Sequence, residues 1–242
     1  MKKALKFTLP LLPVALVAGY FVTGYQLETL DPTMLEEALA QIGGTGVLTL
    51  VSMLQTLGYT LLCGVLGHIL AQKVGLVKTV RFEKKPLLLT LCLSLVFGVI
   101  FSLDYWTFGA VMPELRAGLD QITVNNWVAS ILYGGIVEEL MLRLFFMSLI
   151  AWILQKLLRK QTTGILIAAN VIAAILFAAG HLPAIWMAFG ELTPMLLFRC
   201  FLLNGGFGLF FGWAYRKYGI QYAMIAHASL HIVSKLIWTI FI

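Results

Sequence analysis

Runs of about 20 apolar residues recur along this chain, and they decide what it can fold into. Only 12% of its residues are charged, whereas a soluble domain of this length usually has about twice that share. The sequence therefore predicts an all-α, polytopic transmembrane helix bundle of about seven spans. The expected spans are 7–24, 45–70, 86–103, 127–152, 163–181, 194–214 and 219–241.

Lysine and arginine gather in every second connection between these spans, and the other connections are mainly acidic. By the positive-inside rule, this alternation places the N-terminus in the cytoplasm and the C-terminus outside. No charge run or basic-aromatic pattern suggests a nucleic-acid partner, so we interpret the net charge of +6 through membrane topology. The basic connections hold Lys2, Lys3 and Lys6, then Lys73, Lys78, Arg81, Lys84 and Lys85, then Lys156, Arg159 and Lys160, and finally Arg216 and Lys217.

The first 44 residues raise two questions of organisation. Residues 1–26 combine a basic start with an apolar stretch, a pattern that fits a signal peptide or a first helix. No clear A-x-A cleavage site follows, so we expect a retained helix. The segment 25–44 predicts a short helix outside the membrane, with Asp31 as N-cap, Pro32 in the first turn and Gly43 at the C-terminal stop.

GIVEELMLRL, residues 135–144, places three charged side chains in the middle of the fourth expected span. Each costs about 2.5–3.5 kcal/mol in hydrocarbon on insertion scales. Glu139 and Arg143 are i and i+4 in a helix and can form a buried salt bridge. Glu138 points about 100° away around the helix and is left over. A spare carboxylate in a low-dielectric site suits a general base or acid, and the pair alone supports a structural and a functional role equally.

Three of the four histidines lie in the same half of the chain as these carboxylates. His181 ends the fifth expected span just before a proline, and His227 and His231 are i and i+4 on one face of the seventh. A lone intramembrane histidine usually forms an interhelical hydrogen bond. Three histidines with a carboxylate pair can instead hold a water, a metal or a proton path.

Three motifs follow one another in this half of the chain. GIVEELMLR contains E-E-x-x-x-R, and ILFAAGHL contains F-x-x-x-H from Phe177 to His181. FGLFFGWAYRKYGIQYAMIAHASLH contains a G-x-x-x-G helix, a basic turn and a helix with H-A-x-x-polar. Together they resemble the CAAX-protease and bacteriocin-processing family (CPBP, also called Abi) over roughly residues 127–235. The resemblance implies a hydrolase, an intramembrane endopeptidase.

The resemblance also implies a role for each matching residue. Glu138 matches the glutamate that activates a water as general base, and His181 matches the histidine that helps to hold this water. His227 matches the last-motif histidine, which with a partner stabilises the oxyanion. Glu139 and Arg143 would orient or support the site. Hydrolysis by a directly activated water needs such a base, a water site and an oxyanion donor.

One position departs from the family pattern. The family usually has Asn four residues after the last-motif histidine, and here the residue is His231. A histidine can also donate to an oxyanion, so the role can survive. The change creates H-x-x-x-H on a helix, a spacing that can bind one metal. His227, His231, His181 and Glu138 would then suit zinc. The family is commonly called a metalloprotease family, yet a metal-free glutamate mechanism is also argued for it, and both mechanisms stay open.

The resemblance divides one membrane domain into N-terminal transmembrane helices at 1–126 and a catalytic helical core at 127–242. It implies a membrane-associated peptide or a lipid-modified protein as substrate. Eukaryotic members trim prenylated C-termini, whereas this short chain with minimal loops is more similar to bacterial members linked to pheromone or bacteriocin maturation or to self-immunity. We therefore expect an integral, multi-pass protein of a bacterial cell membrane, in contact with lipids.

A second class of function is also compatible with these residues. A membrane immunity factor or scaffold would use the buried charges for structure, and a proton-coupled transporter would use them as a relay. No inverted repeat or pair of broken helices supports transport. In a scaffold, Glu138 and His227 should tolerate substitution.

Other polar residues in the spans raise questions of position. Counted by rise per residue, Glu138 and His231 fall near mid-membrane but His181 falls nearer the outer side. Side chains that hold one water cannot lie at widely different depths, so we expect the fifth span to be tilted, offset or differently bounded. Arg199 and Lys235 are expected to pair with a glutamate or to extend toward an interface.

The sixth expected span contains a pattern typical of close helix packing. Gly208 and Gly212 form G-x-x-x-G, which lets two helices approach closely. Asn204 precedes them, and we expect it to line a cavity or to form an interhelical hydrogen bond.

Overall fold

The chain folds into a bundle of helices, which confirms the predicted all-α class. The structure is a computed structural model that describes residues 1–30, 32–120 and 122–242, and no strand occurs in these ranges. The elements are α1 (Lys2–Thr8), η1 (Leu9–Leu11), α2 (Leu12–Thr29), α3 (Pro32–Ile42), α4 (Thr45–Lys73), α5 (Lys84–Ser102), α6 (Phe108–Val111), α7 (Pro113–Leu119), α8 (Val124–Ala129), η2 (Ser130–Glu138), η3 (Leu140–Met147), α9 (Ser148–Leu158), α10 (Thr163–Gly180), α11 (Leu182–Phe189), α12 (Pro194–Cys200), η4 (Phe201–Gly205), α13 (Gly206–Tyr218) and α14 (Ile220–Phe241).

Six helical segments in the described ranges are long and apolar enough to cross a membrane. They are Lys2–Thr29, Thr45–Lys73, Lys84–Ser102, Thr163–Phe189, Pro194–Tyr218 and Ile220–Phe241. They match six of the seven expected spans. The remaining one, 127–152, lies within a run of helical elements from α8 to α9 that contains Glu138, Glu139 and Arg143. The count of seven and the cytoplasmic N-terminus stay predictions.

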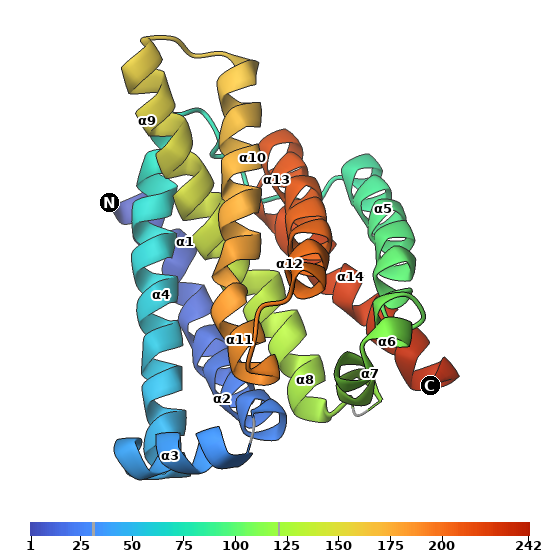
Figure 1. The fold of residues 1–242 in the computed structure, drawn as a ribbon. Helices are drawn as coiled ribbons and strands as arrows, with labels where there is room; N and C mark the ends of the chain where they lie inside the picture. Colours follow the sequence, from blue (N-terminus) through green and yellow to red (C-terminus); the bar gives the residue numbers. More distant parts are fainter. Residues whose placement is uncertain (31, 121) are drawn as a thin grey trace.

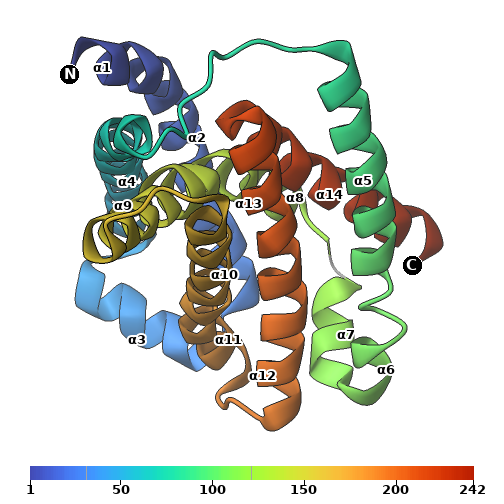
Figure 2. The same ribbon diagram turned by 90° about the horizontal axis from the view of Figure 1, so that it is seen from above.

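The helices of the bundle run roughly side by side, except that α14 is inclined across them (Figures 1 and 2). α14 packs against α5, η2 and α13. The connections that follow α4, α9 and α13 lie at the upper end in Figure 1, and α3 lies crosswise at the lower end. The basic connections therefore share one end of the bundle, as the alternation of charge predicts.

The segment that carries the charged motif is wound differently from the expected α-helix. η2 and η3 are π-helices, in which hydrogen bonds join residues five apart. The angle of about 100° per residue, which holds for an α-helix, therefore does not apply around Glu138. π-Helical turns are rare and occur frequently at functional sites. η4, which contains Asn204, is also a π-helix.

The fifth expected span is longer than its predicted end at residue 181. α10 ends at Gly180, α11 resumes at Leu182, and the two form one apolar segment from Thr163 to Phe189. The predicted end was wrong because Pro183 resembles a signal for the end of a helix. Proline is tolerated in the first turn of a helix because its missing N–H is not needed there. His181 therefore lies inside the long segment and not at its end.

The short helix expected within 25–44 is present as α3, from Pro32 to Ile42. Gly43 and Gly44 follow it, and both have a φ of +98°, a backbone conformation that favours glycine. This agrees with the predicted stop at Gly43. The predicted N-cap, Asp31, lies outside the described residues.

Glycines allow the close helix contacts on which the bundle depends. A side chain at Gly212 would collide with the amide of Asn170, and one at Gly208 would lie 3.3 Å from Arg143 Nη2 and from the Phe177 ring. The G-x-x-x-G pattern therefore packs α13 closely against α10, as expected, and it also makes room for Arg143.

We predict that Gly19→Ala lowers stability where α2 crosses α4. A Cβ there would lie 2.6 Å from Met53 Cα, and overpacking against backbone costs about 1–3 kcal/mol. Gly58→Ala in α4 is the matched control, because a Cβ at Gly58 meets nothing within 4 Å. Thermal unfolding in one detergent should show a lower midpoint for the first variant only. Equal midpoints would contradict the proposed close contact.

Candidate active site

A chain of three side chains forms the centre of the site. Glu139 Oε1 lies 2.9 Å from His227 Nδ1, and His227 Nε2 lies 3.2 Å from His231 Nε2. A carboxylate only accepts hydrogen bonds, so His227 Nδ1–H is the donor to Glu139. The Nε2 atoms of the two histidines then share one proton. The contact joins the charged motif on the π-helical segment to the last motif on α14.

Arg143 compensates the negative charge of Glu139 inside the bundle. Its Nε lies 3.5 Å from Glu139 Oε2, and both side chains are fully buried. This is the expected i, i+4 pair. Three guanidinium nitrogens and Glu139 Oε2 have no hydrogen-bond partner in the described part of the chain. The pair is therefore held by charge and by packing more than by hydrogen bonds.

Two phenylalanines enclose these charges. Phe211 stacks on the His227 ring, with centroids 4.3 Å apart and planes 14° apart. The Arg143 guanidinium lies 5.0 Å from the Phe177 ring centroid and 5.9 Å from that of Phe211. A cation over an aromatic face is attracted to it, more strongly where water is excluded. These contacts fix the orientation of the His227 imidazole and of the arginine.

His181 reaches the same region through Phe177. The Phe177 ring is perpendicular to the His181 ring at 4.7 Å and to the His227 ring at 5.9 Å. His181 Nδ1 lies 2.8 Å from the Phe177 carbonyl oxygen, so Nδ1–H is the donor. Nε2 of His181 is then left as an acceptor. His181 also lies within electrostatic range of His231, so the longer span brings it toward the site.

Glu138 differs from its neighbour Glu139 in its surroundings. It is half-buried, and it makes no hydrogen bond or ion pair with the residues that the structure describes. It lies close enough to Arg143 and Tyr133 to interact with them electrostatically. One carboxylate of the motif is therefore committed to Arg143 and His227, and the other is free, as the sequence predicts.

Gly134 faces the two histidines from η2. A Cβ at this position would lie 3.4 Å from His227 Nε2 and 3.6 Å from His231 Nε2. The neighbouring Gly135 has a different role, because a Cβ there would lie 2.8 Å from Ala228 Cβ on α14. Gly135 lets the two helices touch, and Gly134 keeps space in front of the imidazoles.

The arrangement of the histidines and glutamates differs from the zinc site that the histidine spacing suggests. Between residues 1 and 242, leaving out 31 and 121, no three His, Cys, Asp or Glu side chains lie close enough together to hold a metal ion. In this arrangement His227 Nδ1 is bound to Glu139, and His227 Nε2 faces His231 Nε2. The side chains as arranged do not fit a metal.

Of the remaining intramembrane polar residues, Lys235 lies within electrostatic range of His231, and Arg199 and Asn204 contact other residues. Arg199 pairs with Asp104, its Nε lying 2.8 Å from Oδ1, so it has a carboxylate partner but not a glutamate. Lys235 donates to Asn126 Oδ1 and is only 4% exposed. Its partner is therefore an amide oxygen and not a glutamate. Asn204 Nδ2 lies 3.5 Å from Cys200 Sγ, within its own helical segment.

Two residues of the site, Phe211 and Gly134, were not predicted from the sequence. Phe211 lies between the glycines of G-x-x-x-G, where it is one apolar residue among many. Gly134 precedes the charged motif in a Gly-Gly pair. A glycine pair in a span indicates a close approach, but it does not indicate which glycine faces a reactive group.

The fold and the site define a class: a membrane-embedded helical protein with a buried Glu-Arg-His-His cluster next to a free glutamate. Residues 120–233 match the family model described as type II CAAX prenyl endopeptidase Rce1-like. This match confirms the resemblance to the CAAX-protease family that the motifs show. The match supports a CAAX-type intramembrane endopeptidase that acts on a peptide or lipidated protein in a membrane. Comparisons with curated proteins and with solved structures gave no match.

We predict that Arg143→Met destabilises the fold by about 3 kcal/mol or more, because removal of one partner of a buried pair leaves an uncompensated charge. The double variant Glu139→Gln/Arg143→Met should recover part of this loss. Unfolding midpoints of the wild type, both single variants and the double variant would measure the coupling. Additive effects of the two substitutions would contradict a direct interaction of Glu139 with Arg143.

Proposed function

We propose that this chain hydrolyses a peptide bond by a water that Glu138 activates inside the membrane. The observation that supports this most is the division of labour between the two adjacent glutamates. Glu139 is bound to Arg143 and His227, and Glu138 is half-buried and unpaired in the described structure. A free carboxylate in a site of low dielectric is suited to take a proton from water.

In this proposal the water is held between Glu138 and His181. His181 donates its Nδ1–H to the Phe177 carbonyl, which leaves Nε2 as an acceptor for a water hydrogen. Glu138 takes the second hydrogen as the water oxygen attacks the carbonyl carbon of the substrate. The same proton is then available to the leaving amine when the C–N bond breaks, so no further acid is needed.

His227 and His231 are proposed to stabilise the oxyanion that forms on the substrate. Glu139 fixes the tautomer of His227, so that Nε2 takes part in the shared hydrogen bond with His231. A substrate oxygen that enters in front of Gly134 would be close to both Nε2 atoms and would accept the one proton that they share. Donors that are held in place before the reaction stabilise developing charge most effectively. His231 thus replaces the asparagine that the family usually has there.

The substrate is proposed to be a membrane-associated peptide or a lipid-modified protein of a bacterial cell. In this view residues 127–242 form the catalytic core and residues 1–126 the supporting helices. α2 and α4 contact the π-helical segment of the core. The supporting helices thus pack against the elements that carry Glu138 and Arg143.

We predict that Glu138→Gln abolishes cleavage without loss of fold, with a rate at least about 100-fold lower, because general-base catalysis contributes about 10²–10⁴-fold. Membrane and secreted peptides should be compared between cells that make wild type and cells that make the variant at equal abundance. Peptides present only with the wild type would identify the substrate and its cut site. A scaffold or immunity factor predicts identical peptide sets, and unchanged activity of the variant would exclude Glu138 as base.

We predict that alanine at the two glycines of η2 affects different properties: cleavage at Gly134 and stability at Gly135. Gly134→Ala should keep the melting temperature and lower cleavage at least about tenfold, because the added methyl makes only ordinary contacts but fills space before both imidazoles. Gly135→Ala should lower the melting temperature, because its Cβ would overlap Ala228. Cleavage and thermal unfolding of both variants test this. Full activity of Gly134→Ala would contradict the proposed position of the oxyanion.

A further inference from the structure

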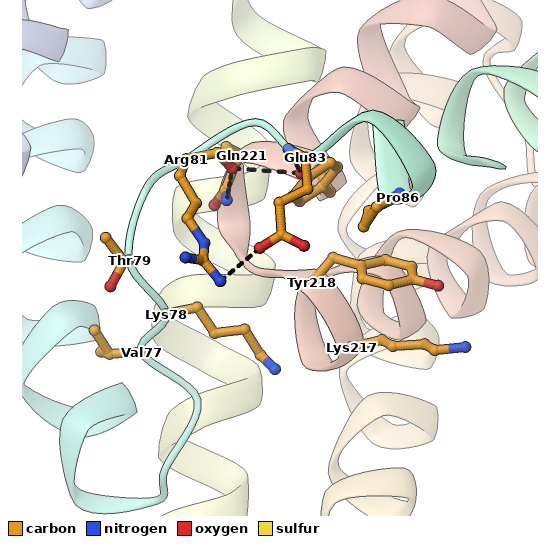
Figure 3. A pocket seen from close by; sticks show the side chains of 10 residues that line it. Val77, Lys78, Thr79, Arg81, Glu83, Pro86, Lys217, Tyr218 and Gln221 are labelled. Carbon is orange, nitrogen blue, oxygen red and sulfur yellow. Dashed lines mark hydrogen bonds and ion pairs between the residues drawn. The ribbon is translucent and has the colours of Figure 1, made fainter. Parts of the chain in front are cut away.

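A cavity of about 530 Å³ lies at the basic end of the bundle, away from the histidines. The connection between α4 and α5 forms one wall, and the turn between α13 and α14 forms the other (Figure 3). Its lining includes Lys78, Arg81, Glu83, Lys217, Tyr218 and Gln221.

The charge of this cavity is predominantly positive. Arg81 is neutralised by Glu83, with Nη2 2.6 Å from Oε1. Lys78 and Lys217 have no carboxylate partner among the residues described. Lys217 Nζ instead lies over the rings of Trp213 and Tyr218, at 5.2 and 5.3 Å. Two lysines without counter-ions in one cavity favour an anionic ligand.

The position of the cavity relative to the spans indicates where such an anion comes from. The connection joins a span that ends at Lys73 to one that begins at Lys84, and the turn joins a span that ends at Tyr218 to one that begins at Ile220. The cavity therefore lies at the depth of the lipid headgroups. Val80 and Phe82 on the connection are 54% and 64% exposed, as residues that contact lipid would be.

A buried acceptor provides a second, independent indication of a ligand. Gln221 is only 7% exposed, and its Oε1 is buried without a hydrogen-bond partner in the described structure. Its Nε2 is engaged, because it donates to the Arg81 carbonyl oxygen at 3.2 Å. An unpaired buried acceptor is unfavourable, so a hydroxyl or ammonium group of a ligand would satisfy it.

The walls are connected by hydrogen bonds that a bound ligand would reinforce. The Glu83 backbone N–H donates to Tyr222 Oη at 2.8 Å, and Tyr222 Oη–H donates to the Arg81 carbonyl oxygen at 3.3 Å. Gln221 and Tyr222 lie in the first turn of α14, whose N-terminal dipole also favours an anion. The basic connection is thus held against the start of α14.

We propose that this cavity binds a phosphate-bearing anion, the headgroup of an anionic phospholipid. Lys78 and Lys217 neutralise the phosphate, and Gln221 Oε1 accepts a hydrogen bond from a headgroup hydroxyl. Phosphatidylglycerol combines both groups. The bound lipid stabilises the junction of the connection with α14. This site does not depend on the proposed proteolysis.

A second basic cavity shows which features are specific to the first. It has a volume of about 590 Å³ and is lined by Lys73, Trp152, Gln155, Lys156, Arg159, Lys160 and Gln161. It also carries positive charge, but none of the unpaired buried polar atoms in the described ranges belongs to it. The second cavity therefore serves as a control that has the positive charge but no unpaired buried acceptor.

The test is the melting temperature of the purified full-length chain in a neutral detergent. Phosphatidylglycerol, phosphatidylcholine and inorganic phosphate are added separately over the same range of concentration. We expect saturable stabilisation by phosphatidylglycerol, by about 4 °C or more, and little effect of phosphatidylcholine. Inorganic phosphate acting as well as the lipid would assign the site to a soluble phosphate compound instead.

Substitution of the lysines locates the effect. Lys78→Gln/Lys217→Gln should remove the stabilisation, and Lys78→Arg/Lys217→Arg should retain it. Lys156→Gln/Lys160→Gln removes the same charge from the second cavity and should leave the stabilisation intact. The side chains of all four lysines are exposed or half-buried, so the variants should fold. Equal losses in both glutamine variants, or equal stabilisation by both lipids, would overturn the proposal.

Discussion

The buried contact of Glu139 with Arg143 and His227 is the constraint on which the centre of this structure depends. An isolated charge in an apolar interior is strongly unfavourable, so each group requires the others. The arginine lies between two phenylalanine rings and against Gly208. Packing thus replaces the hydrogen bonds that the guanidinium lacks. This explains why a small residue, aromatic residues and charges from the π-helical segment, α10, α13 and α14 meet at one point.

The inclined helix α14 brings two histidines to the buried pair of Glu139 and Arg143. Its contacts with η2 bring His227 and His231 to the π-helical segment, and Gly135 permits the close approach. Phe211 from α13 stacks on the His227 imidazole and fixes the orientation of its ring. The start of the same helix forms one wall of the basic cavity. α14 therefore connects the basic cavity with the interior cluster, as α13 also does through Lys217 and Phe211.

Much of the bundle could be predicted from the sequence, because hydropathy alone determines which segments lie in lipid. Six expected spans correspond to long apolar segments. The motif spacing also predicted the Glu139–Arg143 pair, since i, i+4 contacts are local. The end of the fifth span was wrong because Pro183 looks like a stop from its neighbours alone. Glu139 and His227 are 88 residues apart in the sequence. Their contact depends on how α14 crosses η2, which no local sequence pattern describes.

The difference between the two glutamates follows from the same long-range contacts. In sequence they are adjacent and chemically identical, and only the i, i+4 spacing to Arg143 singles out Glu139 as the paired one. Once α14 places His227 against Glu139 and Arg143 pairs with the same carboxylate, that side chain is engaged by two partners. Glu138 has no such partner in the described structure and is half-buried. Two carboxylates in different surroundings can perform different tasks at one pH, and this difference in surroundings supports the proposal that Glu138 is the general base.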